Sequence, residues 1–320
     1  MAAKPKTPQG SDFRSDDMVA ADRAIDALTF AKSRTPFRAA GAPDIRRILV
    51  GVDGTGSSSM ALGWAKEIAL ATGAKLFVAT ITGPIARGPF AQSAVRATLM
   101  QREEKIARDV LEKAVAGLDD AGLDVTGVLA RGFATVELLR IADKKRVDLV
   151  VVGSHGHSGR ERVLVGSVAD SIKDQVSCSV LVAKTPFGSG PVLIPVDGSP
   201  DSRAAAVVGL RLSRRFKAEP QIYHVFEPPV FYDPEDARDE FKHILGEIEL
   251  PSTPAGIRYL LDLGHPRKRI LEYIAQNRPR LVVMGARGLS PIRKLLTGST
   301  GSHVVHESSA SVLLVRRRNG

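Results

Sequence analysis

Apolar runs alternate with amphipathic stretches along most of the chain, a pattern typical of strands that alternate with helices. The run IRRILVGVD ends in Asp-Gly and predicts a buried strand. Residues Ser57–Ala71 then have helical spacing and stop at Gly73, a residue type that commonly ends helices. The elements expected next are strands at Lys75–Ile81, Asp124–Ala130, Val147–Gly153 and Ser179–Ala183, and helices at Ala94–Ala121, Ala134–Lys145 and Ser167–Gln175. Strands rich in Val, Ile and Leu between helices predict a parallel sheet covered on both faces.

The second half of the chain repeats the first. The segment Val147–Ser167, VDLVVVGSHGHSGRERVLVGS, matches Pro279–Ser299, PRLVVMGARGLSPIRKLLTGS, at an offset of 132 residues. Upstream, ILVGVDGTGSSS matches VLIPVDGSPDSR at an offset of 144, from Asp53 to Asp197, so the second copy is 12 residues shorter in its middle (144 minus 132). This shared order and spacing indicates two tandem α/β domains, each a doubly wound five-stranded parallel sheet.

The chain divides into an extension over residues 1–44, a first domain over 45–185 and a second over 190–318. The boundary segment between the domains, Thr185–Pro191, is short, so we expect the domains to pack closely. The polar start of the extension is predicted to be disordered, while Ser15–Lys32 has the thin apolar stripe of a helix. That helix either packs on its own domain or acts as a docking arm.

Composition narrows the partners. The net charge of +10 and the pI of about 9.9 favour anionic partners, although the basic residues are scattered apart from Arg316–Arg318. Aromatic residues make up 5%, too few for stacking platforms on single-stranded nucleic acid, so no specific nucleic acid is expected. The single cysteine, Cys178, cannot form an intramolecular disulfide, which suits a reducing cytoplasm. No apolar run approaches the roughly 20 residues of a membrane span, and the N-terminal stretch lacks a signal-peptide core.

Candidate binding residues follow the first and fourth strands of each copy. In a doubly wound sheet, ligands bind beyond the carboxyl ends of the strands, where the strand order reverses. If the first and fourth strands are neighbours, Asp53 and Gly153 face one crevice, as Asp197 and Gly285 do in the second copy. Glycine lets the backbone approach a ligand closely. A helix that begins at Gly166-Ser167, or at its counterpart in the second copy, offers free N–H groups to a phosphate.

The string G-x2-G-x9-G-S follows an apolar strand twice. Its residues are Gly153, Gly156, Gly166 and Ser167 in the first copy and Gly285, Gly288, Gly298 and Ser299 in the second. This string closely resembles the ATP-binding loop of the universal stress protein family, and the resemblance covers nearly all of Ile45–Arg318. It implies an adenine nucleotide alpha hydrolase-like fold and ATP, with or without Mg, as the ligand. The alternative is that these glycines serve packing alone.

The resemblance also assigns roles to residues. In ATP-binding members the aspartate after the first strand contacts the nucleotide, and the glycine loop holds ribose and phosphates. Backbone after the second strand recognises adenine, which by position is Thr80-Ile81 in the first copy and His224-Val225 in the second. The family dimerises through its fifth strand, so we expect Ser179–Ala183 and Ser311–Val315 to pair the two copies as a pseudo-dimer. A second pairing of chains into a homodimer is left open.

Catalytic chemistry is less well supported by the sequence. There is no G-x4-G-K-[ST] motif. His155, His157, His303 and His306 lack a matching set of metal ligands, so solvent-facing or satisfied roles are expected. The loop residues Arg160, Arg162, Arg293 and Lys294 either neutralise phosphate or form a solvated basic surface.

Hydrolysis needs a positioned base and usually a metal. Apart from Asp53 and Asp197, which could hold a metal, Glu161 is the single acid in the loops. We therefore expect a nucleotide-binding stress or signalling protein that is not an enzyme and whose occupancy alters a protein partner's binding. A slow ATP hydrolase and a non-nucleotide interaction protein are the alternatives.

Overall fold

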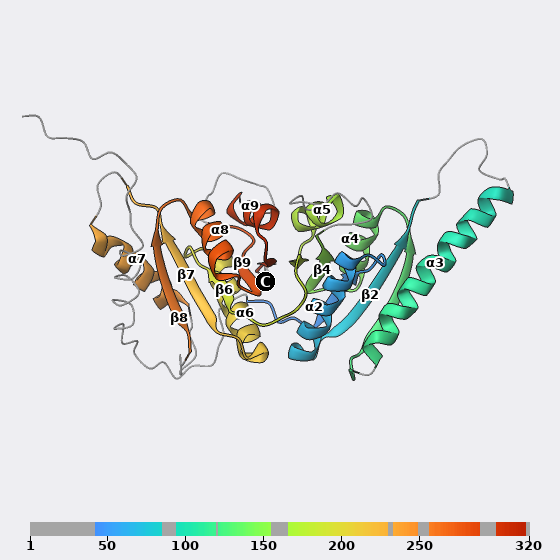
Figure 1. Ribbon diagram of the computed structural model, residues 1–320, viewed down its shortest axis with the longest axis horizontal. Helices are drawn as coiled ribbons and strands as arrows, with labels where there is room; N and C mark the ends of the chain where they lie inside the picture. The colour runs from blue at the N-terminus through green and yellow to red at the C-terminus, as the bar shows by residue number, and fades with distance from the viewer. Residues whose placement is uncertain are drawn as a thin grey trace, which may run out of the picture.

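The structure is a computed structural model that describes residues 42–84, 94–119, 121–154, 166–229, 233–248, 256–288 and 299–317. The predicted helix at Ser15–Lys32 lies outside these residues. All ten strands of the described chain form one sheet, in the order β3-β2-β1-β4-β5-β10-β9-β6-β7-β8 (Figure 1).

The first copy supplies one half of this sheet and four of its helices. Its elements are β1 (Arg47–Gly51), α2 (Gly56–Thr72), β2 (Lys75–Thr82), α3 (Ala94–Asp119), β3 (Val125–Arg131), α4 (Ala134–Lys144), β4 (Leu149–Gly153), α5 (Ser167–Gln175) and β5 (Ser179–Ala183). The expected helix after the first strand is confirmed. It begins where the Thr55 side chain accepts a hydrogen bond from Ser58 N, and it ends at Gly73 with φ 71°.

The second copy repeats the same order. Its elements are β6 (Val192–Pro195), α6 (Pro200–Phe216), β7 (Pro220–Phe226), α7 (Pro234–Glu247), β8 (Arg258–Leu263), α8 (Pro266–Asn277), β9 (Leu281–Gly285), α9 (Ser299–Glu307) and β10 (Ser311–Val315). Within each half the strands are parallel, and the order reverses between the first and fourth strands, β1 and β4 or β6 and β9. The doubly wound α/β architecture is therefore confirmed in both copies.

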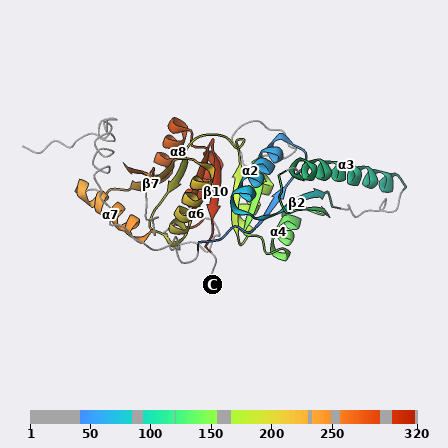
Figure 2. The ribbon, with the colours of Figure 1, turned by 90° about the horizontal axis from the view of Figure 1, so that it is seen from below.

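Helices cover both faces of the sheet, which explains why its strands are apolar throughout. One core lies under α2, α3, α6 and α7, and the other under α4, α5, α8 and α9. Each core runs through both copies without a break, because each includes residues of β5 and β10 as well as of the outer strands. Figure 2 shows α2 and α6 on either side of the junction between the copies. Among the described helices, none combines the length and hydropathy that crossing a bilayer requires.

The copies join through their fifth strands, as predicted. β5 and β10 pair antiparallel, with Leu181 opposite Leu313, and every residue of both strands is buried. We call this junction the seam. The antiparallel pairing places the carboxyl edge of one copy's strands beside the amino edge of the other's, so the two candidate sites lie on opposite edges of the sheet.

Candidate functional site

In the first copy, Asp53 organises the turn at the carboxyl end of β1. Its Oδ1 accepts hydrogen bonds from Thr55 N (3.0 Å) and Thr55 Oγ1 (2.6 Å). Gly54, with φ 81°, makes the turn between them, a backbone conformation that glycine adopts without strain. Because Thr55 caps α2, the carboxylate of Asp53 also fixes where that helix begins. The residue predicted to contact nucleotide therefore lies at a rigid position.

Gly153 lies at the same edge, since β4 pairs with β1. A Cβ at Gly153 would lie 2.7 Å from the backbone carbonyl carbon of Ser57, in the first turn of α2, and would also collide with Ser57 Oγ. The glycine is therefore required for α2 to begin against β4. The packing explanation of this glycine holds, and its effect is to bring the α2 turn, Asp53 and the end of β4 together.

The N-terminus of α5 completes this edge. Gly166 is the N-cap of α5, and its N–H donates to the carbonyl of Ser154, directly after β4 (2.6 Å). Ser167 is exposed in the first turn. The free N–H groups of this turn form the positive end of the helix dipole, which suits an anion. Gly156 and the basic residues predicted for this loop lie outside the described residues.

Thr80 and Ile81, the residues predicted near adenine in the first copy, have different orientations. The direction of the strand backbone is fixed by Ala79, whose carbonyl accepts a hydrogen bond from Val52 N (2.8 Å), so the backbone N–H and C=O of Ala79 point toward β1. Ile81, two residues further, faces the same side but lies beyond the end of β1. Its N–H and C=O are therefore directed at the crevice. The Thr80 side chain points to the face covered by α2 and α3, where it is 4% exposed and its hydroxyl has no hydrogen-bond partner within the described chain.

The second copy repeats this geometry with different residues. Asp197 Oδ1 accepts a hydrogen bond from Ser199 N (3.0 Å), and Ser199 caps α6. A Cβ at Gly285 would lie 2.7 Å from Ser202 N, and a Cβ at Gly288 would lie 2.9 Å from Asp197 Oδ2. Ser299 begins α9, while its side chain and Gly298 are outside the described residues. Asp197, Gly285 and Gly288 are thus brought together.

His224 gives the second site a different wall. Its Nδ1 lies 2.8 Å from the carbonyl of Val196, which requires this nitrogen to be the donor. Its ring stacks on Phe241, with centroids 5.5 Å apart, and its Nε2 lies 3.3 Å from a carboxylate oxygen of Glu240 without hydrogen-bond geometry. Val225 has the backbone orientation of its counterpart Ile81, since the carbonyl of Tyr223 accepts from Val196 N. The first copy has the small Thr80 where the second has this imidazole.

Three residues of the second site were missed by the sequence analysis: Asp201, Glu240 and Arg287. Asp201 lies in the first turn of α6, where burial raises the pKa of its carboxyl while Arg287, Arg317 and Arg316 act in the opposite direction. It occupies the position of Ser57 in the first copy, at the offset of 144. A position-by-position comparison of the copies would have found this difference.

The two histidines on α9 each lie beside a carboxylate and are partly exposed. His303 Nε2 lies 3.4 Å from Glu307 on the same helix. His306 Nε2 lies 2.8 Å from Asp170 Oδ1 on α5, across the seam. No group of three or more potential metal ligands occurs within the part of the chain that the structure describes.

Comparison with known proteins agrees with this architecture. The model of the universal stress protein family matches residues 44–184 and again residues 189–316. Universal stress protein Rv2005c of Mycobacterium tuberculosis is 25% identical over 295 residues, which cover 84% of this chain and 97% of that protein. Universal stress protein MJ0531 of Methanocaldococcus jannaschii is 34% identical over 79 residues, so the match spans 46% of that relative.

Solved structures extend the similarity to the fold. A universal stress protein from Archaeoglobus fulgidus superposes with a TM-score of 0.66 at 18% identity, covering 85% of this chain and 98% of that chain. At this identity the likeness concerns the fold alone. Two family matches in tandem nevertheless account for both halves of the sheet, and this chain belongs to the universal stress protein family.

Proposed function

We propose that the chain binds ATP at two sites, one at the carboxyl edge of each half-sheet, and that occupancy alters the binding of a protein partner. The observation that carries this proposal is a repeated convergence. An aspartate after the first strand and a glycine that ends the fourth strand lie at one edge of the sheet in both copies, and in the first copy the N-terminus of α5 lies beside them.

The polar atoms of each crevice fit an adenine nucleotide. Adenine presents adjacent donor and acceptor groups, which match the N–H and C=O of one residue, Ile81 or Val225. The buried Thr80 hydroxyl supports a further polar contact, since a buried hydroxyl without a partner is costly. The helix N-termini at Gly166 and Ser299 suit the phosphates, for which Mg would supply additional positive charge. These residues remain predictions for nucleotide contacts.

The phosphate-facing helices provide a route from the sites to the seam. α5 begins at the first site, and near its other end the carbonyl of Lys173 accepts a hydrogen bond from Arg316 Nη2 of the second copy (2.6 Å). α9 begins at the second site, and Lys184 Nζ of the first copy donates to the carbonyls of His306 (3.2 Å) and Ser308 (2.6 Å) at its end. Each copy therefore donates hydrogen bonds to the carboxyl-terminal end of the other copy's helix, α5 or α9, whose N-terminus is proposed to face phosphate. A shift of either helix on ligand binding would reach the opposite copy.

Binding is favoured over rapid hydrolysis. Asp53 already accepts two hydrogen bonds from Thr55, which limits its use as a base. Glu240 and Asp201 are acids beside the second site, so slow hydrolysis there stays open as the alternative. An interaction protein without nucleotide is the third candidate. The cytoplasmic location expected from the single cysteine likewise stays a prediction.

Titration calorimetry with ATP, ADP and AMP, with and without Mg, tests the proposal. We expect two sites per chain, one lost in Asp53→Ala and the other in Asp197→Ala. Glu103→Ala removes an exposed carboxylate on α3 that has no part in either site and should keep both. Mass spectrometry of nucleotide released from the purified protein identifies the bound species. Absence of binding by all three nucleotides would establish the interaction-protein alternative. Turnover near 10 per second, abolished by both substitutions together, would establish an enzyme, since that is about the median enzyme rate.

A further inference from the structure

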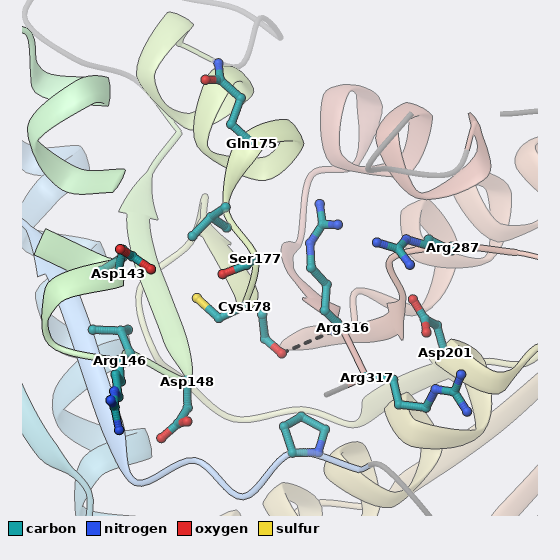
Figure 3. A pocket seen from close by; sticks show the side chains of 15 residues that line it. Asp143, Arg146, Asp148, Gln175, Ser177, Cys178, Asp201, Arg287, Arg316 and Arg317 are labelled. Carbon is teal, nitrogen blue, oxygen red and sulfur yellow. Dashed lines mark hydrogen bonds between the residues drawn. The ribbon is translucent and has the colours of Figure 1, made fainter. Parts of the chain in front are cut away.

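A cavity of about 530 Å³ opens at one end of the seam, between the amino edge of the first copy and the carboxyl edge of the second (Figure 3). Its volume falls within the range of small-molecule sites. The first copy supplies the amino ends of β4 and β5, including Asp148 and Cys178. The second copy supplies Asp201 and three arginines, Arg287, Arg316 and Arg317. The cavity thus exists only because the two copies pair.

The wall from the second copy carries an excess of positive charge. Three guanidinium groups act on the carboxylate of Asp201, and Asp174 of α5 attracts Arg316 as well. Arg316 is 5% exposed, and burial lowers its pKa, with the positive charge of Arg287 lowering it further. Like charges held together in a partly dry site are destabilising, and an anion between them would relieve that cost.

The geometry keeps Arg316 in place while leaving the mouth accessible. Its Nη2 donates to the carbonyl of Lys173, and its backbone N–H donates to Ser179 Oγ (3.2 Å). Arg287 and Arg317 are exposed at the cavity edge, beside the buried guanidinium. Guanidinium groups donate several N–H groups in a plane and suit phosphate or carboxylate oxygens. The opposite wall offers Ser177, the thiol of Cys178 and Arg146, together with the carboxylates of Asp143 and Asp148.

The other end of the seam is filled by the molecule itself. At that end the repeat places Lys184 where the cavity has Arg316, and Arg280 where the cavity has Asp148. The linker between the copies, Thr185–Pro191, crosses the space. Phe187 of the linker packs edge-on against Trp64 at a centroid distance of 5.0 Å, and Arg280 stacks 5.1 Å from Phe187. One end of the seam is therefore closed by aromatic side chains, while its counterpart keeps an open, arginine-lined cavity.

We propose that this cavity binds a small phosphate-bearing anion, at a site separate from the two nucleotide crevices. The phosphate lies against Arg287, Arg316 and Arg317, and the rest of the molecule faces the first copy. Such a ligand would contact both copies at once and would hold the seam together. The cavity shares Asp201 and Arg287 with the surroundings of the second site, but it uses none of the residues predicted there to contact nucleotide, Asp197, Gly285 and Gly288.

Titration calorimetry of the full chain at low salt, with inorganic pyrophosphate as the probe, tests the site. We expect one pyrophosphate per chain in protein saturated with ATP. The double variant Arg287→Gln and Arg317→Gln changes exposed side chains only, and it should weaken pyrophosphate binding about tenfold or more. The control Arg102→Gln, on the exposed surface of α3, should leave it unchanged.

A second measurement locates the probe. Cys178 is the single cysteine of the chain and lines the cavity, so its rate of maleimide labelling reports on occupancy. Burial raises the pKa of this thiol to about 12, so slow labelling is expected, and pyrophosphate should slow it further in the wild type but not in the double variant.

Equal pyrophosphate binding in the double variant and the control would overturn the cavity assignment. Loss of pyrophosphate binding on saturation with ATP would place the anion in a nucleotide crevice and would also overturn it, while ATP binding stands. Conversely, arginine-dependent pyrophosphate binding in a chain that binds no ATP would support the cavity and refute the proposed function.

Discussion

The two ends of the seam use matched positions of the repeat but have different contents. At one end Trp64, fully buried on α2, donates a hydrogen bond to the carbonyl of Thr185 (2.7 Å) and packs against Phe187 and Phe216. At the other end Val208 of α6 stands where Trp64 would be, and the cavity opens. Covalent connectivity explains the difference, because the chain crosses between the copies once and only one end of the seam can contain the linker.

The comparison shows how a repeat becomes asymmetric without a change of fold. The strands that pair the copies remain equivalent, since Leu181 and Leu313 are both fully buried opposite each other. The cations after these strands, Lys184 and Arg316, donate to the helix carbonyls of His306 and Lys173 in the opposite copy. The two ends of the seam differ in content, with the linker and aromatic side chains at one end and the cavity at the other. Function that depends on one copy alone is therefore expected at the edges rather than in the paired strands.

The largest effect on stability is expected from truncating the aromatic cluster of Trp64, Phe187 and Phe216 at the linker end of the seam. Trp64→Ala should lower the free energy of unfolding by about 3–5 kcal/mol, since it leaves a large cavity and removes the indole hydrogen bond to the Thr185 carbonyl. Val208→Ala, at the matched position, should cost about 2 kcal/mol, because it removes less buried volume. Urea denaturation of both variants measures the difference. Equal losses of unfolding free energy in the two variants would show that the aromatic cluster does not stabilise the seam more than the matched position does.

The next effect concerns the glycines that end the fourth strands. Gly153→Ala and Gly285→Ala each place a Cβ against helix backbone and should cost about 1–3 kcal/mol, because backbone cannot yield as a side-chain end can. Each should also lower nucleotide stoichiometry at its own site only. Gly117→Ala, on α3 with open space around it, should instead stabilise the protein by up to about 1 kcal/mol. If both variants lost stability but kept full nucleotide stoichiometry, these glycines would serve packing and not nucleotide binding.

A smaller effect is the pH dependence of the free energy of unfolding, to which we expect Lys184 to contribute and Arg316 not to contribute. Burial lowers the pKa of Lys184 from 10.5 to about 8, so the unfolded chain binds more protons between these values. Its contribution to stability therefore increases as the pH rises from 8, by at most about 1.4 kcal/mol per pH unit. Above pH 9 the raised pKa of Cys178 acts in the opposite direction, because the unfolded thiol ionises first.

The lysine is therefore best observed from pH 8 to 9, where the unfolded thiol, with a pKa of 9.0, is still mainly protonated. Denaturation at half-unit steps should show the slope flattened in Lys184→Met and retained in Arg316→Met, since arginine stays charged throughout this interval. If the slope of unfolding free energy against pH were unchanged in Lys184→Met, a group other than Lys184 would be responsible for it.

The smallest effect is expected at Thr80. Thr80→Val removes a buried hydroxyl that has no partner in the described chain and should stabilise the nucleotide-free protein by about 1 kcal/mol. It should also weaken ATP binding at the first site and spare the second, where His224 stands at this position. Calorimetry separates the two sites once Asp197→Ala has removed the other. Unchanged affinity would exclude the Thr80 hydroxyl from contact with the nucleotide.

Sequence was sufficient for elements whose signals are local. Gly73 marked the end of α2 because a left-handed residue ends a helix wherever it occurs. The fifth strands were predicted residue for residue, since short apolar runs between polar segments leave little choice. β4 begins at Leu149 rather than at Val147, because Val147 N–H donates to the carbonyl of Ala142 and continues the end of α4. That hydrogen bond has no signature in the hydrophobic pattern.

The sequence by itself determined the repeat, the two half-sheets, and the placement of Asp53, Gly153 and their counterparts at strand ends, because periodicity and spacing are local properties. The tertiary structure decided that Gly153 is needed against α2, that Ile81 and Thr80 face different directions, and that Arg316 reaches α5. It also decided the seam cavity, whose walls come from segments more than 100 residues apart, such as Asp148 and Arg316. Such distant groups meet only after two sheets pair antiparallel, and no local pattern encodes which edges then face each other.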